Sequence, residues 1–188
     1  MQRFYGDFLN QRTLIVGEVN TGKTRTTLDI LTRWIAADPT QPMTILDLAP
    51  EPVGGIGGRL SLPSGFNGRY LFADIVPPRL TGRTPDDIAR LAVANARAAE
   101  PLLTAILTHP HPVLVVNDAS LYLQAGDYRR FTEIIQSAAT VLINAYYGTS
   151  LGDQPISHRE RRLTERLMQD CDRVIRLPEN GNKLKAES

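Results

Sequence analysis

The sequence has little cysteine, few aromatic residues and almost no excess of one charge. A single cysteine, Cys171, excludes a disulfide within the chain. The net charge of +1 provides no long-range field that would attract nucleic acid or an anionic membrane surface. No apolar run approaches the roughly 20 residues that a membrane-spanning helix needs, and no basic segment followed by an apolar run marks a secretory signal. These absences favour a cytoplasmic protein that binds a small ligand at a local site.

Internal repeats and low-complexity blocks are also missing, so the whole chain can be interpreted as folded structure. Its 188 residues, 42% of them hydrophobic and 22% charged, are enough for one full-sized core. We therefore expect a single domain over residues 1–188, with a flexible C-terminal tail from about residue 179.

Hydrophobic periodicity predicts strands that alternate with helices. The expected strands cover residues 13–16, 43–48, 69–76, 113–118, 140–148 and 173–177. The expected helices cover residues 24–37 and 84–108, and two more begin at Asp127 and at Ser157. This alternation predicts a three-layer α/β fold, with a mainly parallel central sheet and helices on both faces.

Local signals set the ends of these elements. Thr84 is placed to cap the second helix, which is expected to kink or restart at Pro101. Ser157 and Glu160 have the spacing of a capping box for the last helix. The long segment between the second and third strands is rich in Gly, Pro and Ser and is expected to be a loop. Its residues 54–58 form either a flexible lid over a second substrate or a plain surface loop.

The segment "GEVNTGKT" at residues 17–24 matches the pattern G-x-x-x-x-G-K-[ST] at every specified position. Its glycines let backbone N–H groups turn inward, and the N-terminus of the following helix adds a positive field, so the segment is suited to bind a chain of phosphates. Lys23 supplies a cation for the terminal phosphates, and the Thr24 hydroxyl is placed to ligate Mg²⁺. The candidate nucleotide-binding residues are Gly17, Glu18, Val19, Asn20, Thr21, Gly22, Lys23, Thr24 and Arg25.

A magnesium ion at this loop needs an acid from a neighbouring strand. Asp118 is the best candidate, because it ends the most apolar strand at the carboxyl edge of the expected sheet. Asp47 and Asp74 hold similar positions on other strands and remain alternatives. Lys23 and Asp118 are therefore the candidate catalytic residues, and Thr24 and Asp118 are the candidate metal ligands.

With this loop and this order of strands, the chain resembles the P-loop NTPases over nearly its full length. Within that superfamily, its architecture is similar to the RecA-like ATP:corrinoid adenosyltransferases. The segments that carry the similarity are, in chain order, "GEVNTGKT", "PLLTAILTHPHPVLVVND", "DYRRFTEIIQSAATVLINAYYG" and "SHRERRLTERLMQDCDRVIRL". The resemblance implies Mg-ATP as the bound nucleotide, and it carries over to the 17–24 loop and Asp118.

Two differences from that superfamily bear on the expected reaction and on the choice of nucleotide. Many ATP-hydrolysing members place a glutamate after the strand acid to polarise the attacking water, whereas this chain has Ala119, so fast hydrolysis is not expected. Glu18 and Glu51 are either substitutes for that glutamate or solvated loop acids. Guanine-specific members carry [NT]-K-x-D after a late strand, and the corresponding "INAYYGTS" lacks both the lysine and the acid. ATP is therefore favoured over GTP.

The leading hypothesis is a Mg-ATP-binding enzyme whose turnover is slow or controlled by its substrate. An ATP:corrinoid adenosyltransferase-like reaction is one alternative, and a non-enzymatic, nucleotide-controlled binding module is another. Arg159, Arg161 and Arg162 open the last helix near the carboxyl edge of the sheet, where they either reach a phosphate or form a solvated face. The sequence does not identify the second substrate or protein partner, and it is compatible with a homo-oligomer.

Overall fold

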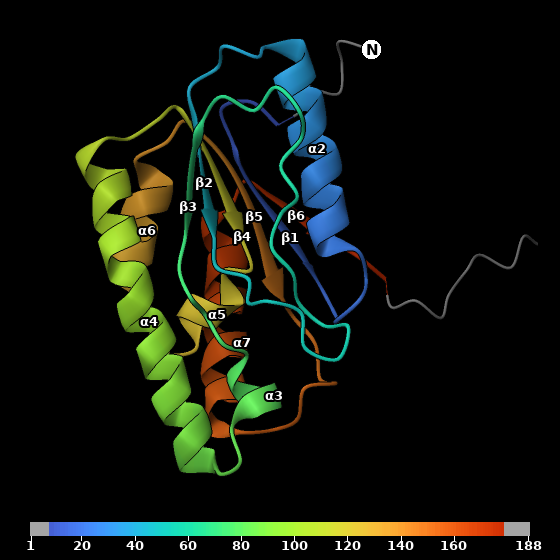
Figure 1. The fold of residues 1–188 in the computed structure, drawn as a ribbon, viewed down its shortest axis with the longest axis vertical. Helices are drawn as coiled ribbons and strands as arrows, with labels where there is room; N and C mark the ends of the chain where they lie inside the picture. Colours follow the sequence, from blue (N-terminus) through green and yellow to red (C-terminus); the bar gives the residue numbers. More distant parts are fainter. Residues whose placement is uncertain (1–7, 179–188) are drawn as a thin grey trace, which may run out of the picture.

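Short runs of aliphatic and β-branched residues pair into one twisted sheet in the computed structural model, which describes residues 8–178 (Figure 1). Its strands are β1 (Arg12–Gly17), β2 (Met43–Asp47), β3 (Arg69–Phe72), β4 (Val113–Asn117), β5 (Thr140–Tyr146) and β6 (Arg173–Arg176). They lie in the order β3-β2-β4-β5-β1-β6, and each pairing runs parallel. The tail expected from about residue 179 lies outside the described residues.

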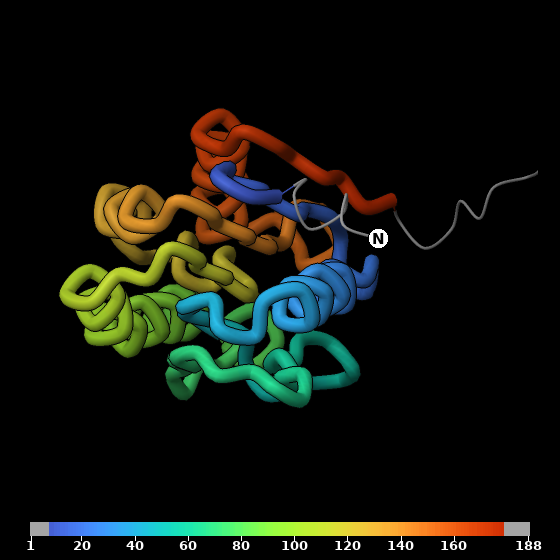
Figure 2. Tube along the Cα trace, turned by 90° about the horizontal axis from the view of Figure 1, so that it is seen from above, coloured from blue at the N-terminus to red at the C-terminus, as the bar shows by residue number. Residues whose placement is uncertain are grey.

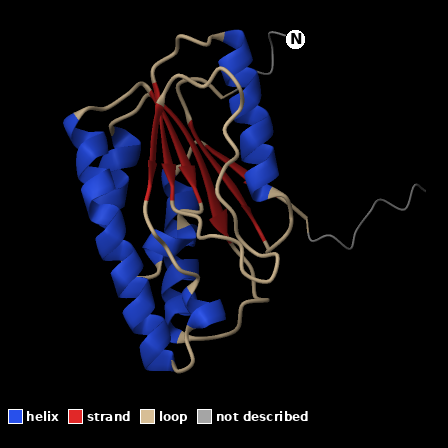
Figure 3. Ribbon diagram, viewed as in Figure 1, coloured by secondary structure: helices blue, strands red, loops and turns tan. Residues whose placement is uncertain are grey.

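Helices cover both faces of the sheet. They are α2 (Lys23–Ala37), α3 (Pro78–Thr81), α4 (Pro85–Thr108), α5 (Ser120–Leu123), α6 (Tyr128–Gln136) and α7 (Pro155–Asp170). Buried Leu31 and Trp34 of α2 pack on one face, while Leu103, Phe131 and Leu163 of α4, α6 and α7 belong to the core on the other. Figures 2 and 3 show these two helical layers with the sheet between them. The three-layer α/β fold is thus confirmed, with a sheet that is parallel throughout.

The helix ends agree with the sequence at some caps and differ at others. The Thr84 hydroxyl accepts a hydrogen bond from the Asp87 N–H at 3.1 Å, as expected of an N-cap. Helix α4 continues through Pro101 to Thr108, so the predicted restart is wrong. The predicted capping box is also wrong, because α7 begins earlier, after Gln154, and Glu160 is buried inside the helix.

Strand β3 ends at Phe72, four residues before the predicted end of the strand. The segment beyond it turns toward α4, where the Asn95 side chain accepts from the Val76 N–H at 3.1 Å and donates to the Val76 carbonyl at 2.7 Å. These two hydrogen bonds pair the N–H and the carbonyl of Val76, which in a longer strand would pair with a neighbouring strand. They also fix the segment that leads into α3, which lies near the carboxyl ends of the strands (Figure 1). No helix in the described part of the chain combines the length and the apolar character needed to cross a membrane.

Candidate functional site

The 17–24 loop joins β1 to α2 through two residues in the left-handed conformation. Asn20 has φ 58° and Gly22 has φ 89°. Gly22 occupies the N-cap position of α2, where no side chain caps the helix. Gly17 is required for close approach, since a Cβ there would lie 2.8 Å from Thr21 Oγ1 and 3.0 Å from the Leu177 carbonyl oxygen. A helix N-terminus without a side-chain cap, preceded by a curled backbone, is an arrangement that binds anions.

Lys23 lies at the centre of this arrangement. Its Nζ donates a hydrogen bond to the Glu18 carbonyl oxygen at 2.5 Å and lies 5.9 Å from the centroid of the Tyr146 ring. Burial lowers the pKa of Lys23, while the charges of Asp118 and Glu18 act in the opposite direction. The Lys23 amino group is therefore held close to its own loop and to the carboxylate of Asp118.

Asp118 faces Lys23 from the end of β4. It adopts φ 56°, and its N–H donates to Asn144 Oδ1 at 2.9 Å. The Ser120 hydroxyl donates to the carboxylate at 2.5 Å. Burial raises the pKa of Asp118, whereas the Ser120 hydrogen bond and the charge of Lys23 lower it. Strand β5 separates β4 from β1, so Asp118 is not on a strand adjacent to the loop's own strand, contrary to expectation.

A cavity of about 360 Å³ joins the loop to the end of β4. It collects five of the nine candidate loop residues, together with Asp118: Val19, Asn20, Gly22, Lys23 and Thr24. Gly17, Glu18, Thr21 and Arg25 are not part of its wall. Most of the remaining wall is apolar and comes from the segment after β2, from α3 and α5, and from the segment after β5: Pro50, Ile56, Pro77, Pro78, Leu80, Leu121 and Leu151. Residues 54–58 therefore reach the cavity through Ile56 and Gly57.

The two alternative acids have other partners. Asp47 is fully buried, and its carboxylate accepts hydrogen bonds from the Leu60 N–H at 2.7 Å and the Tyr70 hydroxyl at 2.8 Å. The Ala49 N–H and the Asn117 side chain supply two more. Asp74 is fully exposed and pairs with Arg59 at 3.5 Å. Neither acid is part of the cavity wall.

Two asparagines that sequence reasoning missed connect the ends of the central strands. The Asn117 amide donates to Asp47 at 2.8 Å, and the Asn144 amide donates to Asn117 Oδ1 at 2.7 Å and to the Thr27 hydroxyl at 2.9 Å. Thr27 in turn donates to the Lys23 carbonyl at 3.0 Å. This polar chain holds β2, β4, β5 and α2 in one arrangement. Its signal in the sequence is an amide side chain within an otherwise apolar strand, "VLVVN" and "VLINA".

Glu18 is a partly exposed loop acid whose carboxylate is directed at the segment after β5 and not at the cavity. Its carboxylate accepts hydrogen bonds from the N–H groups of Thr149 and Ser150 and from the Ser150 hydroxyl at 2.5 Å. Burial opposes its ionisation, but the hydrogen bonds from Ser150, Thr149 and Val19 outweigh it and lower the pKa of Glu18 to about 2. Gly148 allows this approach, since a Cβ there would collide with the carboxylate. Glu18 thus positions the segment after β5.

A glutamate is missing beside Asp118, and the structure shows how its position is filled. Ala119 is completely buried in the core, and its N–H donates to the Asn144 carbonyl at 2.9 Å. Glu51 is exposed and pairs with Arg59 at 3.3 Å, outside the cavity wall. Neither Glu18 nor Glu51 therefore replaces the missing base next to Asp118.

A second cavity, of about 550 Å³, adjoins the first along α7. Arg79 and Tyr146 belong to the walls of both. Of the three arginines singled out in the sequence, Arg161 and Arg162 line this second cavity, whereas Arg159 donates to the Gly126 carbonyl at 2.7 Å. Arg79 was not expected at the site, because nothing in "PPRLTG" distinguishes it from a surface arginine.

Comparison with solved structures gives a number of matches, among them one at low sequence identity. It is the "Crystal structure of Pyrococcus furiosus Hef helicase domain", with a TM-score of 0.44 and 15% sequence identity. The match covers 95% of this chain, which spans only 37% of that one. No protein-family model matches the sequence, and no curated protein is detectably similar. The functional conclusion therefore depends on the geometry of the site itself.

Proposed function

We propose that this protein binds Mg-ATP in the first cavity and is an ATP-dependent enzyme whose turnover is slow or depends on a second substrate. The observation that carries the proposal is the convergence of the 17–24 loop, Lys23 and Asp118 on one cavity. The loop offers backbone N–H groups and the helix N-terminus to phosphates, and Lys23 offers its charge to the terminal phosphate.

The residues present also fit a magnesium ion bound together with the nucleotide. Magnesium prefers oxygen ligands and usually keeps several waters, with one or two protein groups and the phosphates completing its shell. Thr24 and Asp118 both line the cavity and would be those protein groups. The described residues contain no cluster of three His, Cys, Asp or Glu side chains that could hold a metal. When bound, the ion would neutralise charge on the phosphates.

The arrangement around Asp118 favours control by a second substrate over rapid hydrolysis. Water attack needs a positioned base, and Ala119 offers none at the place next to Asp118. The apolar wall formed by Pro77, Pro78 and Leu121 leaves room for an organic acceptor beside the terminal phosphate. An ATP:corrinoid adenosyltransferase-like reaction is one form of this function, and the products of turnover identify it. Adenosyl transfer releases triphosphate, whereas phosphoryl transfer releases ADP.

A nucleotide-controlled binding module is the second candidate, favoured by the position of Arg79 between two cavities. It is distinguished by an ATP-dependent change in binding to a partner without any change in the nucleotide. Rapid release of ADP without an acceptor would contradict the argument from Ala119.

Lys23→Ala tests nucleotide binding itself. Removing a cation that hydrogen-bonds to phosphate is expected to lower Mg-ATP affinity by about 100-fold while the fold is retained. Titration calorimetry measures the affinity, and circular dichroism checks the fold. Arg33→Ala, on the exposed side of the same helix, is the matched control and should bind as wild type. Unchanged affinity in folded Lys23→Ala would rule out this site for nucleotide.

A further inference from the structure

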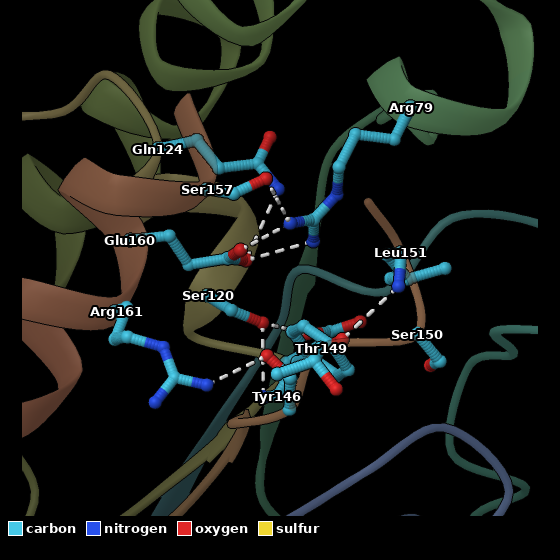
Figure 4. A network of polar contacts seen from close by, with 12 residues as sticks. Arg79, Ser120, Gln124, Tyr146, Thr149, Ser150, Leu151, Ser157, Glu160 and Arg161 are labelled. Carbon is cyan, nitrogen blue, oxygen red and sulfur yellow. Dashed lines mark hydrogen bonds and ion pairs between the residues drawn. The ribbon is translucent and has the colours of Figure 1, made fainter. Parts of the chain in front are cut away.

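Arg79 is one of the two residues that line both cavities, together with Tyr146, and it is the charged one of the pair. It comes from the short helix α3, and its side chain is only 6% exposed. In Figure 4 it points from α3 toward Glu160 of α7. The guanidinium donates to both oxygens of that carboxylate, at 2.6 and 3.1 Å, and to the Ser157 hydroxyl at 3.3 Å. Glu160 is just as buried, with 3% of its side chain exposed.

The same guanidinium lies close to the place expected for the terminal phosphate. Arg79 Cζ is 5.1 Å from the centroid of the Tyr146 ring, and Lys23 Nζ is 5.9 Å from the same centroid. Burial raises the pKa of Asp118, and the positive charges of Lys23 and Arg79 both oppose that rise. Lys23 and Arg79 therefore border the same ring and the same cavity, so a phosphate bound at Lys23 lies in the cavity that Arg79 also lines.

Gln124 offers a hydrogen-bond acceptor that is available to Arg79 when its side chain turns from Glu160 toward the first cavity. Its Nε2 donates to Glu160 at 3.1 Å, but its Oε1 is buried without a hydrogen-bond partner in the described structure. Gln124 also lines the first cavity. Because a buried acceptor without a donor is costly, this oxygen favours a donor that arrives with the ligand or moves with it. A guanidinium N–H turned toward the first cavity is such a donor.

We propose that Arg79 distinguishes a nucleoside triphosphate from a diphosphate, because the terminal phosphate takes the guanidinium from Glu160 and so changes the wall of the second cavity. This inference rests on the proposed function, since it assumes nucleotide at the 17–24 loop. Arginine binds phosphate and carboxylate with the same two-pronged geometry, so either anion satisfies it. A terminal phosphate that carries two negative charges and lies next to Lys23 is a stronger partner for Arg79 than the Glu160 carboxylate.

Glu160 tolerates the loss of Arg79 because it can accept a proton. Burial raises the pKa of Glu160 to about 7, although Arg79 and Gln124 lower it and Asp118 raises it further. Without the guanidinium the carboxyl group becomes neutral near physiological pH and keeps its hydrogen bond from Gln124. The exchange therefore leaves no unpaired charge in the interior.

The test compares the affinities of Mg-ADP and of the non-hydrolysable β,γ-imido analogue of Mg-ATP by calorimetry. In wild type the analogue should bind more tightly than ADP. Arg79→Met is expected to weaken the analogue by about tenfold and ADP by less than about twofold, as for one lost charged hydrogen bond. Glu160→Gln is expected to strengthen the analogue several-fold, since it removes the competing charge, and to leave ADP unchanged.

Two further variants keep the test decisive. Arg79→Met combined with Glu160→Gln removes both charges, so the variant folds even if a lone buried carboxylate does not, and it should show the same loss for the analogue. Arg161→Met is the matched control, because Arg161 lines only the second cavity and contacts the Gly148 carbonyl at 3.0 Å. Equal losses for both nucleotides, or a ratio unchanged from wild type, would overturn the role of Arg79. Absence of binding of either nucleotide to wild type would instead overturn the proposed function and this inference with it.

Discussion

Asp47 and Asp118 mark the carboxyl ends of two adjacent strands, β2 and β4, and both follow apolar runs. Asp47 is surrounded by donors from its own protein, including the Leu60 N–H of the glycine-rich segment, which folds back over it. Asp118 accepts a bond from Ser120 and otherwise faces Lys23 across the cavity. The difference shows that an acid at a strand end becomes structural when a returning loop brings it donors. Where no loop returns, it stays available to a ligand.

The largest effect that this comparison predicts is on stability, for Asp47→Asn. The amide places N–H groups against donors that previously met a carboxylate, and buried donors are left without partners. The free energy of unfolding should fall by about 2 to 3 kcal/mol. Urea denaturation measures it. A variant as stable as wild type would show that the four hydrogen bonds to Asp47 do not hold the segment in place.

Asp118→Asn should affect ligand binding rather than stability. An amide keeps the shape of the side chain but loses the charge that orders the waters of a metal ion, so ATP affinity in the presence of magnesium should fall about tenfold. Affinity measured with EDTA in place of magnesium should change much less. The free energy of unfolding should stay within about 1 kcal/mol of wild type, because the Ser120 hydroxyl is the donor to this carboxylate and the amide oxygen can still accept its hydrogen bond. Equal losses with and without magnesium would remove Asp118 from the metal site.

Glu18 sharpens the comparison, since it resembles Asp47 in its donors but lies nearer the surface. Its pKa in the folded protein, about 2, is below its ordinary value of 4.5. The carboxylate therefore contributes stability that is complete above pH 4.5 and is lost as the pH falls toward 2. Over that range the melting temperature of wild type should fall further than that of Glu18→Gln. Parallel curves for the two proteins would contradict the assignment.

Asp74→Asn should give the smallest effect. Its carboxylate is fully exposed and meets Arg59 at 3.5 Å, and exposed pairs of this kind contribute little. Both the free energy of unfolding and the magnesium dependence of ATP binding should match wild type. A loss of magnesium dependence in this variant would move the metal site away from Asp118.

The sequence was sufficient for the fold class because periodicity and loop residues are local signals. It was also sufficient to predict that the 17–24 loop joins a strand to a helix. It favoured Asp118 but left Asp47 and Asp74 as alternatives, since the partners of these acids depend on donors from distant segments. Arg79 and Glu160 could not be paired from sequence either, because they are 81 residues apart. Their meeting depends on where α3 is placed by Asn95, which the sequence presents as one more residue of a long helix.

The polar chain from Asp47 through Asn117 and Asn144 to Thr27 has a consequence for the order of folding. Its hydrogen bonds join residues that are 70, 27 and 117 positions apart in the chain. Each bond closes a loop that must lose its conformational entropy first, so contacts of this range form late. The β1–α2 unit can form earlier from local contacts, but the base of the cavity exists only after β2, β4 and β5 have assembled. Recovery of ligand binding during refolding should therefore coincide with completion of the sheet and lag behind the appearance of helix.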